Sequence, residues 1–160
     1  MAAVPGYTIE QIEDAFVSTL QPMKSDGAVG LRTLKTYQGE LSDPGKLKDA
    51  FIALFPAILV VYGGSRFVDG GARKVERMRF TLFACDRNLR GEEAARRGSG
   101  TSPGAYAICE AARDRLFGSR LGLKIEPLEL LRQDAIWFGQ GISVYSQDWE
   151  TGNFHLFPAS

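Results

Sequence analysis

The alternation of hydrophobic and polar positions predicts a helix near the start of the chain. Four apolar residues recur there at helical spacing: Ile12, Ala15, Phe16 and Leu20. Thr8 and Gln11 have the spacing of a capping box, and Tyr7 is placed to pack on Ile12 as a hydrophobic staple. Pro22 follows close to the expected end of this helix.

The next patterns predict a strand, a second helix and a buried strand. Residues 31–37 alternate loosely and favour a first strand. Asp43 can cap a helix that begins at Pro44 and ends before Pro56. Its apolar stripe is Leu47, Ala50, Phe51 and Leu54. Residues 57–62 form an unbroken apolar run, which is typical of an interior strand covered on both faces.

Residues 77–85 alternate at the period of a strand, with Met78, Phe80, Leu82 and Ala84 on one face. Before this strand, the pairs Gly63–Gly64 and Gly70–Gly71 bracket a segment that is long for a tight hairpin, so we expect a flexible connection. After it, residues 86–98 are too charged and too closely flanked by glycine to belong to the core. We interpret that basic loop as a surface that contacts another macromolecule.

The last third of the chain predicts a helix and two strands. Ser102–Pro103 begins the helix, Gly118 suits a left-handed cap, and the apolar stripe is Ala105, Ile108, Cys109, Ala112 and Leu116. Strands are expected near residues 128–137 and 142–149, with an apolar tail at 153–157 that could pair as an edge. The order of elements favours an α+β fold: a single domain over residues 1–160 with a mainly antiparallel or mixed sheet and helices on one face. Residues 1–6 and 152–160 are expected to be flexible or interface-forming termini.

Composition narrows the class of protein. Lysine plus arginine equal the acids at 19 each, which argues against a protein that coats DNA. Cys85 and Cys109 lie at apolar positions, so both are expected to be reduced core residues, with a single disulfide as the alternative. No run approaches the roughly 18 apolar residues of a membrane span, and the N-terminus lacks the pattern of a signal peptide. We therefore expect a soluble, intracellular protein without a metal site, because His155 is the only histidine.

Catalytic motifs are weak. A catalytic triad that joins His155 to a serine or cysteine and an acid stays open, but a partly buried or surface histidine is favoured. The loop Gly98–Gly104 precedes a helix, yet Pro103 occupies the third glycine position of a dinucleotide fingerprint and the strand ends too early. Glu92 and Glu93 are adjacent and so diverge, which favours a solvated pair over acid–base catalysis. We predict no catalytic residue and no cofactor.

Two groups of residues favour protein contacts. The candidate interface cations are Arg66, Arg73, Lys74, Arg87, Arg90, Arg96 and Arg97, with Arg77 and Arg79 nearby. A merely solvated basic loop remains an alternative. The aromatic residues Trp137, Phe138, Tyr145, Trp149, Phe154 and Phe157 should mostly be core, although aromatics on terminal strands also suit subunit interfaces.

Several dispersed segments resemble one family. They are YQGEL at 37–41, LFPAILVVYGG at 54–64, DRNLRG at 86–91, GAY at 104–106 and FGQGISVY at 138–145. Together they resemble the tail terminators of Mu-like phages and prophages, over residues 7–149. The resemblance implies a small protein with a helix-flanked sheet that assembles into a six-membered ring. It implies no catalytic residues and no obligatory cofactor.

The resemblance also implies partners and location. Such a ring caps the tail tube protein, ends tail polymerisation and presents a surface to the neck, possibly beside the sheath. Assembly would take place in the host cytoplasm, and the protein would then stay in the virion tail. Because DNA crosses the ring, a basic lumen would retain it, so we expect the arginine loop to face protein neighbours. The alternatives are a neck or tail-completion protein, a small nucleotide-binding enzyme and a basic-loop nucleic-acid adaptor.

Overall fold

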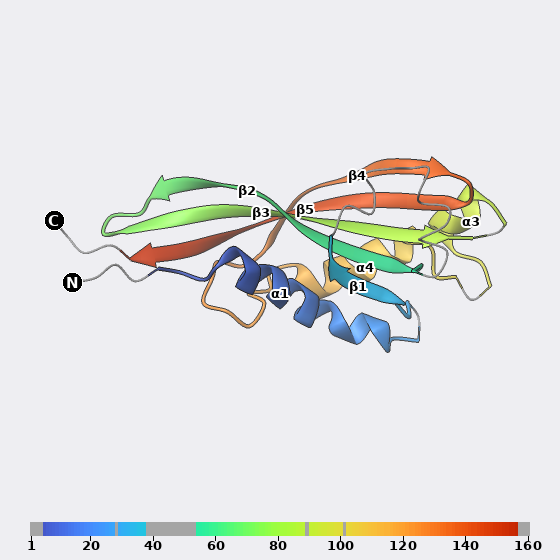
Figure 1. Ribbon diagram of the computed structural model, residues 1–160, viewed down its shortest axis with the longest axis horizontal. Coiled ribbons are helices and arrows are strands. Elements are labelled where there is room, and N and C mark those ends of the chain that lie inside the picture. Colours follow the sequence, from blue (N-terminus) through green and yellow to red (C-terminus); the bar gives the residue numbers. More distant parts are fainter. Residues whose placement is uncertain (1–4, 28, 38–53, 89, 101, 157–160) are drawn as a thin grey trace.

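The computed structural model describes residues 5–27, 29–37, 54–88, 90–100 and 102–156. Five strands form one twisted sheet in the order β1-β2-β3-β5-β4 (Figure 1). The strands are β1 (Thr33–Thr36), β2 (Ala57–Asp69), β3 (Arg73–Arg87), β4 (Glu129–Gly139) and β5 (Ile142–Leu156). β1 runs parallel to β2, and all other neighbours are antiparallel. The mixed sheet confirms the predicted α+β class.

Helices α1 (Ile9–Leu20) and α4 (Ala105–Leu116) pack on one face of the sheet, and a 3₁₀ turn, η1 (Gln21–Lys24), follows α1. The predicted capping box is present: the Gln11 backbone N–H donates to Thr8 Oγ1 (3.1 Å), and the Thr8 N–H donates to Gln11 Oε1 (2.8 Å). Ile12, Phe16 and Leu20 are buried as the periodicity indicates.

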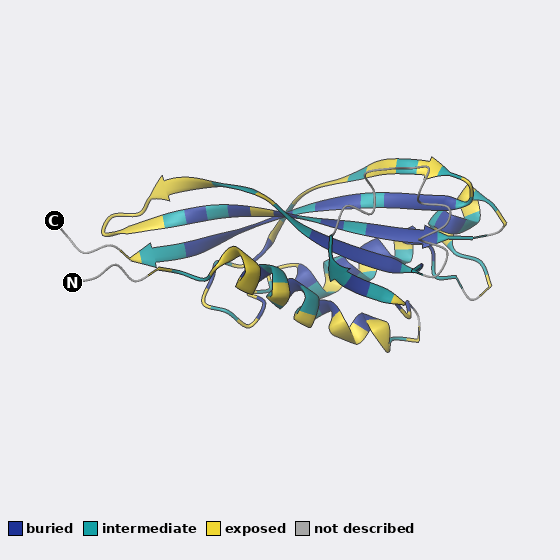
Figure 2. Cartoon of the chain, in the orientation of Figure 1, coloured by how far each residue is buried: buried dark blue, intermediate teal, exposed yellow. Residues whose placement is uncertain are grey.

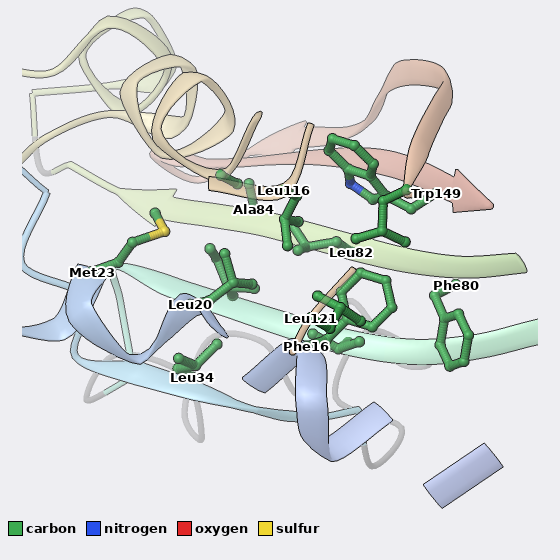
Figure 3. Packing of buried hydrophobic residues seen from close by; sticks show 14 of the residues in the cluster. Phe16, Leu20, Met23, Leu34, Phe80, Leu82, Ala84, Leu116, Leu121 and Trp149 are labelled. Atoms are coloured by element: carbon green, nitrogen blue, oxygen red, sulfur yellow. The ribbon is translucent and has the colours of Figure 1, made fainter. Parts of the chain in front are cut away.

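The main core lies between these helices and the sheet, as Figure 3 shows. Met78, Phe80, Leu82 and Ala84 all point into it, which confirms the predicted alternation of that strand. The rings of Phe16 and Phe80 lie 4.9 Å apart between centroids. Replacing either residue by alanine should lower the free energy of unfolding by about 3–5 kcal/mol, because removal of a fully buried aromatic ring leaves a cavity.

A second, smaller cluster covers the opposite face at one end of the sheet. Its buried members are Phe55, Ala57, Leu59, Cys85, Ile142 and Val144. Ile58 and Val60 belong to the main core, so residues 57–60 are buried on both faces and the predicted interior strand is confirmed. Cys85 and Cys109 are both buried. The predicted helix that begins at Pro44 lies outside the described residues as far as residue 53.

The expected flexible connection between residues 63 and 74 is wrong. β2 continues through Gly63 and Gly64 with a bulge between Tyr62 and Gly64, and it pairs with β3 as far as Asp69 and Lys74. Gly64 has φ +122°, a conformation that glycine adopts readily, so the pair of glycines bends the strand instead of ending it. The true turn is at Gly70 and Gly71, where the Gly70 N–H donates to the Arg73 carbonyl (2.9 Å).

The result is an arm that extends past the helices (Figures 1 and 2). We define the arm as residues 64–69 of β2, 73–79 of β3 and 150–156 of β5. β5 is thus longer than the predicted strand at 142–149, because the apolar tail continues it and pairs with β3 up to Leu156. The described parts of both termini meet there: the Tyr7 N–H donates to Asn153 Oδ1 (3.1 Å), and Asn153 Nδ2 donates to the Tyr7 carbonyl (2.8 Å).

The predicted basic loop and the start of the last helix also need correction. β3 runs on to Arg87, and a short helix, α3 (Glu92–Arg97), occupies much of the segment, because acids in its first turn and arginines in its last turn suit the helix dipole. α4 begins at Ala105 after Gly104 instead of at Ser102. The β4–β5 turn is as predicted, with positive φ at Gln140 and Gly141 (54° and 74°), as in a type I′ hairpin.

Candidate interaction surfaces

The predicted interface cations are divided between two opposite ends of the molecule. Arg66, Arg73 and Lys74 lie on the arm, whereas Arg87, Arg90, Arg96 and Arg97 lie at the end of the sheet that carries α3 (Figure 1). The two groups of cations are close in the sequence but far apart in the structure. The two ends must be treated as separate surfaces.

Two arm cations near the turn are held by neighbours in the arm. The Arg73 guanidinium lies 4.6 Å from the centre of the Phe154 ring, and Lys74 Nζ lies 2.5 Å from Asp69 Oδ1. Both cations are exposed, and so are the apolar side chains of Phe67, Val68 and Leu156. The arm tip thus combines positive charge with apolar surface.

Beside the bulge of β2, the open face of the sheet has a depression of about 200 Å³. It is lined by Gly63, Gly64, Ser65, Arg66, Arg77, Arg79 and Glu150, and we call it the arginine depression. Arg77 Nε and Nη2 donate to Glu150 Oε1 (3.0 and 2.9 Å), and Nη1 donates to Glu126 Oε2. Partial burial acts to lower the pKa of Arg77, but Glu150 and Glu126 together raise it above its usual value.

The other two arginines of the depression, Arg66 and Arg79, can still form ion pairs with an incoming group. Arg66 has a side chain 70% exposed and lies 3.7 Å from Glu150, a carboxylate already bonded twice by Arg77. Arg79 is exposed and forms no ion pair within the described residues. The sequence did not indicate that Glu126 and Glu150 would partner Arg77, because these residues are 49 and 73 positions away from it.

At the other end, Asp86 is a buried carboxylate with three donors. Its Oδ2 accepts from Ser102 Oγ and from the Gly104 N–H (both 2.7 Å), and its Oδ1 accepts from the Arg87 N–H (2.8 Å). Burial raises the pKa of Asp86 above its usual value, and these hydrogen bonds act in the opposite direction. No local sequence pattern indicates this role of Asp86, because its partners follow it by up to 18 residues.

The position of Asp86 disfavours a nucleotide at the loop Gly98–Gly104. A phosphate at the start of α4 would meet this carboxylate, which already accepts from the Gly104 N–H. A Cβ on Gly104 would lie 2.3 Å from the Gly98 backbone nitrogen, so these glycines permit close packing of the loop on itself. Their presence is explained without a ligand.

His155 has a structural environment. Its Nδ1 accepts from the Gly6 N–H (2.8 Å), so Nε2 carries the proton that it donates to Glu76 Oε1 (2.9 Å). Glu76 Oε2 in turn accepts from Ser65 Oγ (2.7 Å). Both ring nitrogens are thus used to hold the N-terminal segment on the arm, and a catalytic triad finds no support. The described residues contain no group of three metal-ligating side chains and no helix long and apolar enough to cross a membrane.

The α3 end carries an aromatic patch, defined as Tyr106, Phe138 and Tyr145 with the guanidinium of Arg96. The Tyr145 ring lies edge-on to both other rings at 5.4 and 5.5 Å, and Arg96 lies 5.5 Å from the centre of the Phe138 ring. Burial and the bond from its hydroxyl to Tyr106 raise the pKa of Tyr145 to about 12. Tyr106 and Phe138 are exposed, and tyrosine, phenylalanine and arginine are residue types enriched at protein interfaces.

The remaining cations of this end have separate environments. Arg90 Nη1 donates to Ser99 Oγ (2.7 Å), and Arg97 pairs with Glu93 at 3.3 Å on the exposed side of α3. Arg87 is half-buried, and its Nε has no hydrogen-bond partner among the described residues. Of the other predicted aromatics, Trp149 is buried in the main core and Trp137 packs on the second cluster, while Phe157 lies outside the described residues.

Next to the patch, the outer edge of β4 is uncovered in the described structure. Register shifts interrupt its pairing between Leu130 and Arg132 and again between Ala135 and Trp137. The residues within these shifts, Leu131 and Ile136, are exposed and apolar. Bulges of this kind discourage the addition of another strand, so this edge presents side chains instead of a pairing surface.

Comparison with known proteins decides the family. Residues 8–154 match the family model described as "Bacteriophage Mu, Gp37". The chain belongs to this family. The resemblance to a Mu-like phage protein is thereby confirmed over nearly the same residues. No curated protein matches the sequence.

The fold of this Mu Gp37 family member also occurs in a solved assembly. A chain of the structure titled "Virion of native gene transfer agent (GTA) particle" superposes with a TM-score of 0.56 at 16% sequence identity. The alignment covers 92% of this chain and 98% of that chain. At this identity the likeness shows a shared fold over almost the whole length of both proteins.

Proposed function

We propose that the protein is a structural component of a phage virion and caps the tail tube as a tail terminator. The observation that carries this proposal is its membership of a bacteriophage Mu family over residues 8–154. The shared fold with a chain of a virion particle supports it. The protein would assemble in the host cytoplasm, as a homo-hexamer in the virion, and remain in the tail.

The two interaction surfaces suit such a role. A terminator must bind the last ring of the tail tube protein and must then present a different surface, to which no further tube subunit can bind. The arm is basic with apolar side chains at its tip, whereas the α3 end is aromatic with arginines around it. Two chemically different ends can bind two different neighbours, such as the tube protein on one side and the neck on the other.

The cations of both ends are assigned to protein neighbours. DNA crosses the ring of a tail terminator, and a channel lined with free arginines would bind its phosphates strongly. Most of these cations already have an acidic, aromatic or hydroxyl partner within the chain. No specific nucleic-acid contact and no cofactor are part of the proposal.

Antibody–gold labelling of purified virions tests the location. We expect label at the head-proximal end of the tail, because the terminator binds the last tube ring to be added. Label along the tail, at the opposite end, or nowhere on the particle would contradict the proposal. A neck protein would also be labelled near the head, so the effect of gene loss on tail length, considered in the Discussion, separates that alternative.

A further inference from the structure

We infer that the arginine depression binds the acidic outer face of α1 from a second copy of this chain. This contact would join neighbouring subunits head to tail in the ring proposed above, and to that extent it rests on the proposed function. The partner is chosen by charge, by the placement of the two surfaces and by apolar residues beside each.

The depression offers two arginines to an incoming carboxylate. Arg77 is saturated by Glu126 and Glu150, and it holds the floor of the depression in place. Arg66 and Arg79 reach solvent on the same sheet face, since their pairing partners in the register are Arg77 and Gly64. Each exposed guanidinium presents a planar fork of N–H donors that suits carboxylate oxygens.

Helix α1 carries the complementary charge. It contains Glu10, Glu13 and Asp14 and no lysine or arginine. Glu10 and Asp14 are exposed, lie one turn apart and form no ion pair within the described residues. Glu13 is different: it turns inward and accepts from the backbone of Tyr62, and burial raises its pKa.

The two surfaces lie on opposite sides of the same sheet. Phe80 packs on Phe16 of α1, and Arg79, its neighbour in β3, therefore points to the other face. A single chain cannot bring its own α1 to its own arginine depression. A second copy can, and because the two contacting surfaces differ, the contact is heterologous and can close into a ring.

Apolar side chains extend both surfaces. Ile9, next to Glu10, is 41% exposed. Val68, two positions from Arg66 on the same face of β2, is also 41% exposed. The formal charge of the chain is zero, so charges of opposite sign on two faces can neutralise each other between copies.

Charge reversal tests this contact. One double variant, Glu10→Arg with Asp14→Arg, makes the α1 face basic, and a second, Arg66→Glu with Arg79→Glu, makes the depression acidic. Sedimentation velocity at about 50 mM salt, where surface charges are weakly screened, gives the oligomer distribution. We expect the wild-type protein to self-associate and each double variant to associate at least about tenfold more weakly.

Recovery makes the test specific. An equimolar mixture of the two double variants should associate again. The basic α1 of the first variant matches the acidic depression of the second, and the acidic α1 of the second matches the basic depression of the first. The fourfold variant that carries all changes should also recover. As a control for altered charge alone, Arg132→Asp with Asp134→Arg reverses an exposed ion pair on β4 and should leave association unchanged.

Three results would overturn the inference: a wild-type chain that stays monomeric up to about 1 mM, double variants that associate like wild type, or a mixture that remains dissociated. These results are independent of the tail-capping role. Normal head-to-tail association in a protein absent from virions would remove that role and leave this contact standing. If the tail end is labelled but the purified protein is monomeric and the mixed variants do not associate, the tail-capping role would stand and this contact would be excluded.

Discussion

At the scale of single residues, Asp86 joins the end of β3 to the segment that leads into α4. Its carboxylate holds the end of β3, Ser102 and the first N–H of the α4 entry together. Asp86→Ala should reduce the free energy of unfolding by about 2–4 kcal/mol, because it leaves buried donors without an acceptor. Urea denaturation measures the change.

The matched control for Asp86 is Glu93, an exposed acid on α3. Glu93 meets only Arg97 at one-turn spacing, so Glu93→Ala should change stability by about 0.5 kcal/mol or less. Equal effects of Asp86→Ala and Glu93→Ala would contradict the role given to the buried carboxylate.

Cys109 should be chemically inert in the folded protein. Burial raises its pKa to about 12, so the reactive thiolate is scarce near neutral pH, and the sulfur is also shielded from solvent. We expect no reaction with a thiol reagent at pH 8 in native buffer and full reaction in denaturant. Rapid labelling of Cys109 in the native protein, identified by mass spectrometry, would show that α4 does not pack as described.

At the scale of elements, the arm depends on Arg77. Arg77→Met keeps much of the side-chain volume but removes the cation that bonds Glu126 and Glu150, and Glu150 keeps only the exposed Arg66 at 3.7 Å. We expect a loss of about 1–3 kcal/mol, together with faster hydrogen exchange in β3 and β5 of the arm than in the main core. Arg79→Met is the matched control and should leave stability nearly unchanged, since Arg79 is exposed. Uniform exchange across the sheet in Arg77→Met would contradict a locally stabilised arm.

Local signals account for the elements that the sequence predicted well. The capping box of α1, the alternation of β3 and the turn at Gln140–Gly141 all depend on residues a few positions apart. The arm was missed because the pair Gly63–Gly64 has the composition of a loop, whereas cross-strand pairing converts it into a bulge.

The candidate surfaces were predicted only in part. The sequence identified Arg66, Arg73, Lys74 and the α3 arginines as interface candidates, and these positions stay a prediction. It could not reveal that the two groups occupy opposite ends, since this follows from the length of the β2–β3 hairpin. Nor could it place Tyr106 and Phe138 against Tyr145, because these ring contacts join α4 and β4 to β5 through the fold.

At the scale of the whole molecule, the aromatic patch should matter for assembly more than for folding. Phe138→Ala removes an exposed ring that contacts Tyr145 and Arg96, so we expect a change in stability below about 1 kcal/mol. If the patch binds a neighbouring virion protein, the same change should reduce the yield of infectious particles in a complementation assay. Wild-type yield from a stably folded Phe138→Ala protein would exclude the patch as a required contact.

The central claim is that this protein ends the growth of the tail tube. Its most direct test is the distribution of tail lengths, by electron microscopy, in lysates of a phage that lacks the gene. We expect tails of irregular or excessive length that are not joined to heads, with normal tails restored when the wild-type gene is supplied in trans. Tails of normal length that fail to join would instead indicate a neck protein, and tails of normal length joined to heads would show that the protein is not a tail terminator.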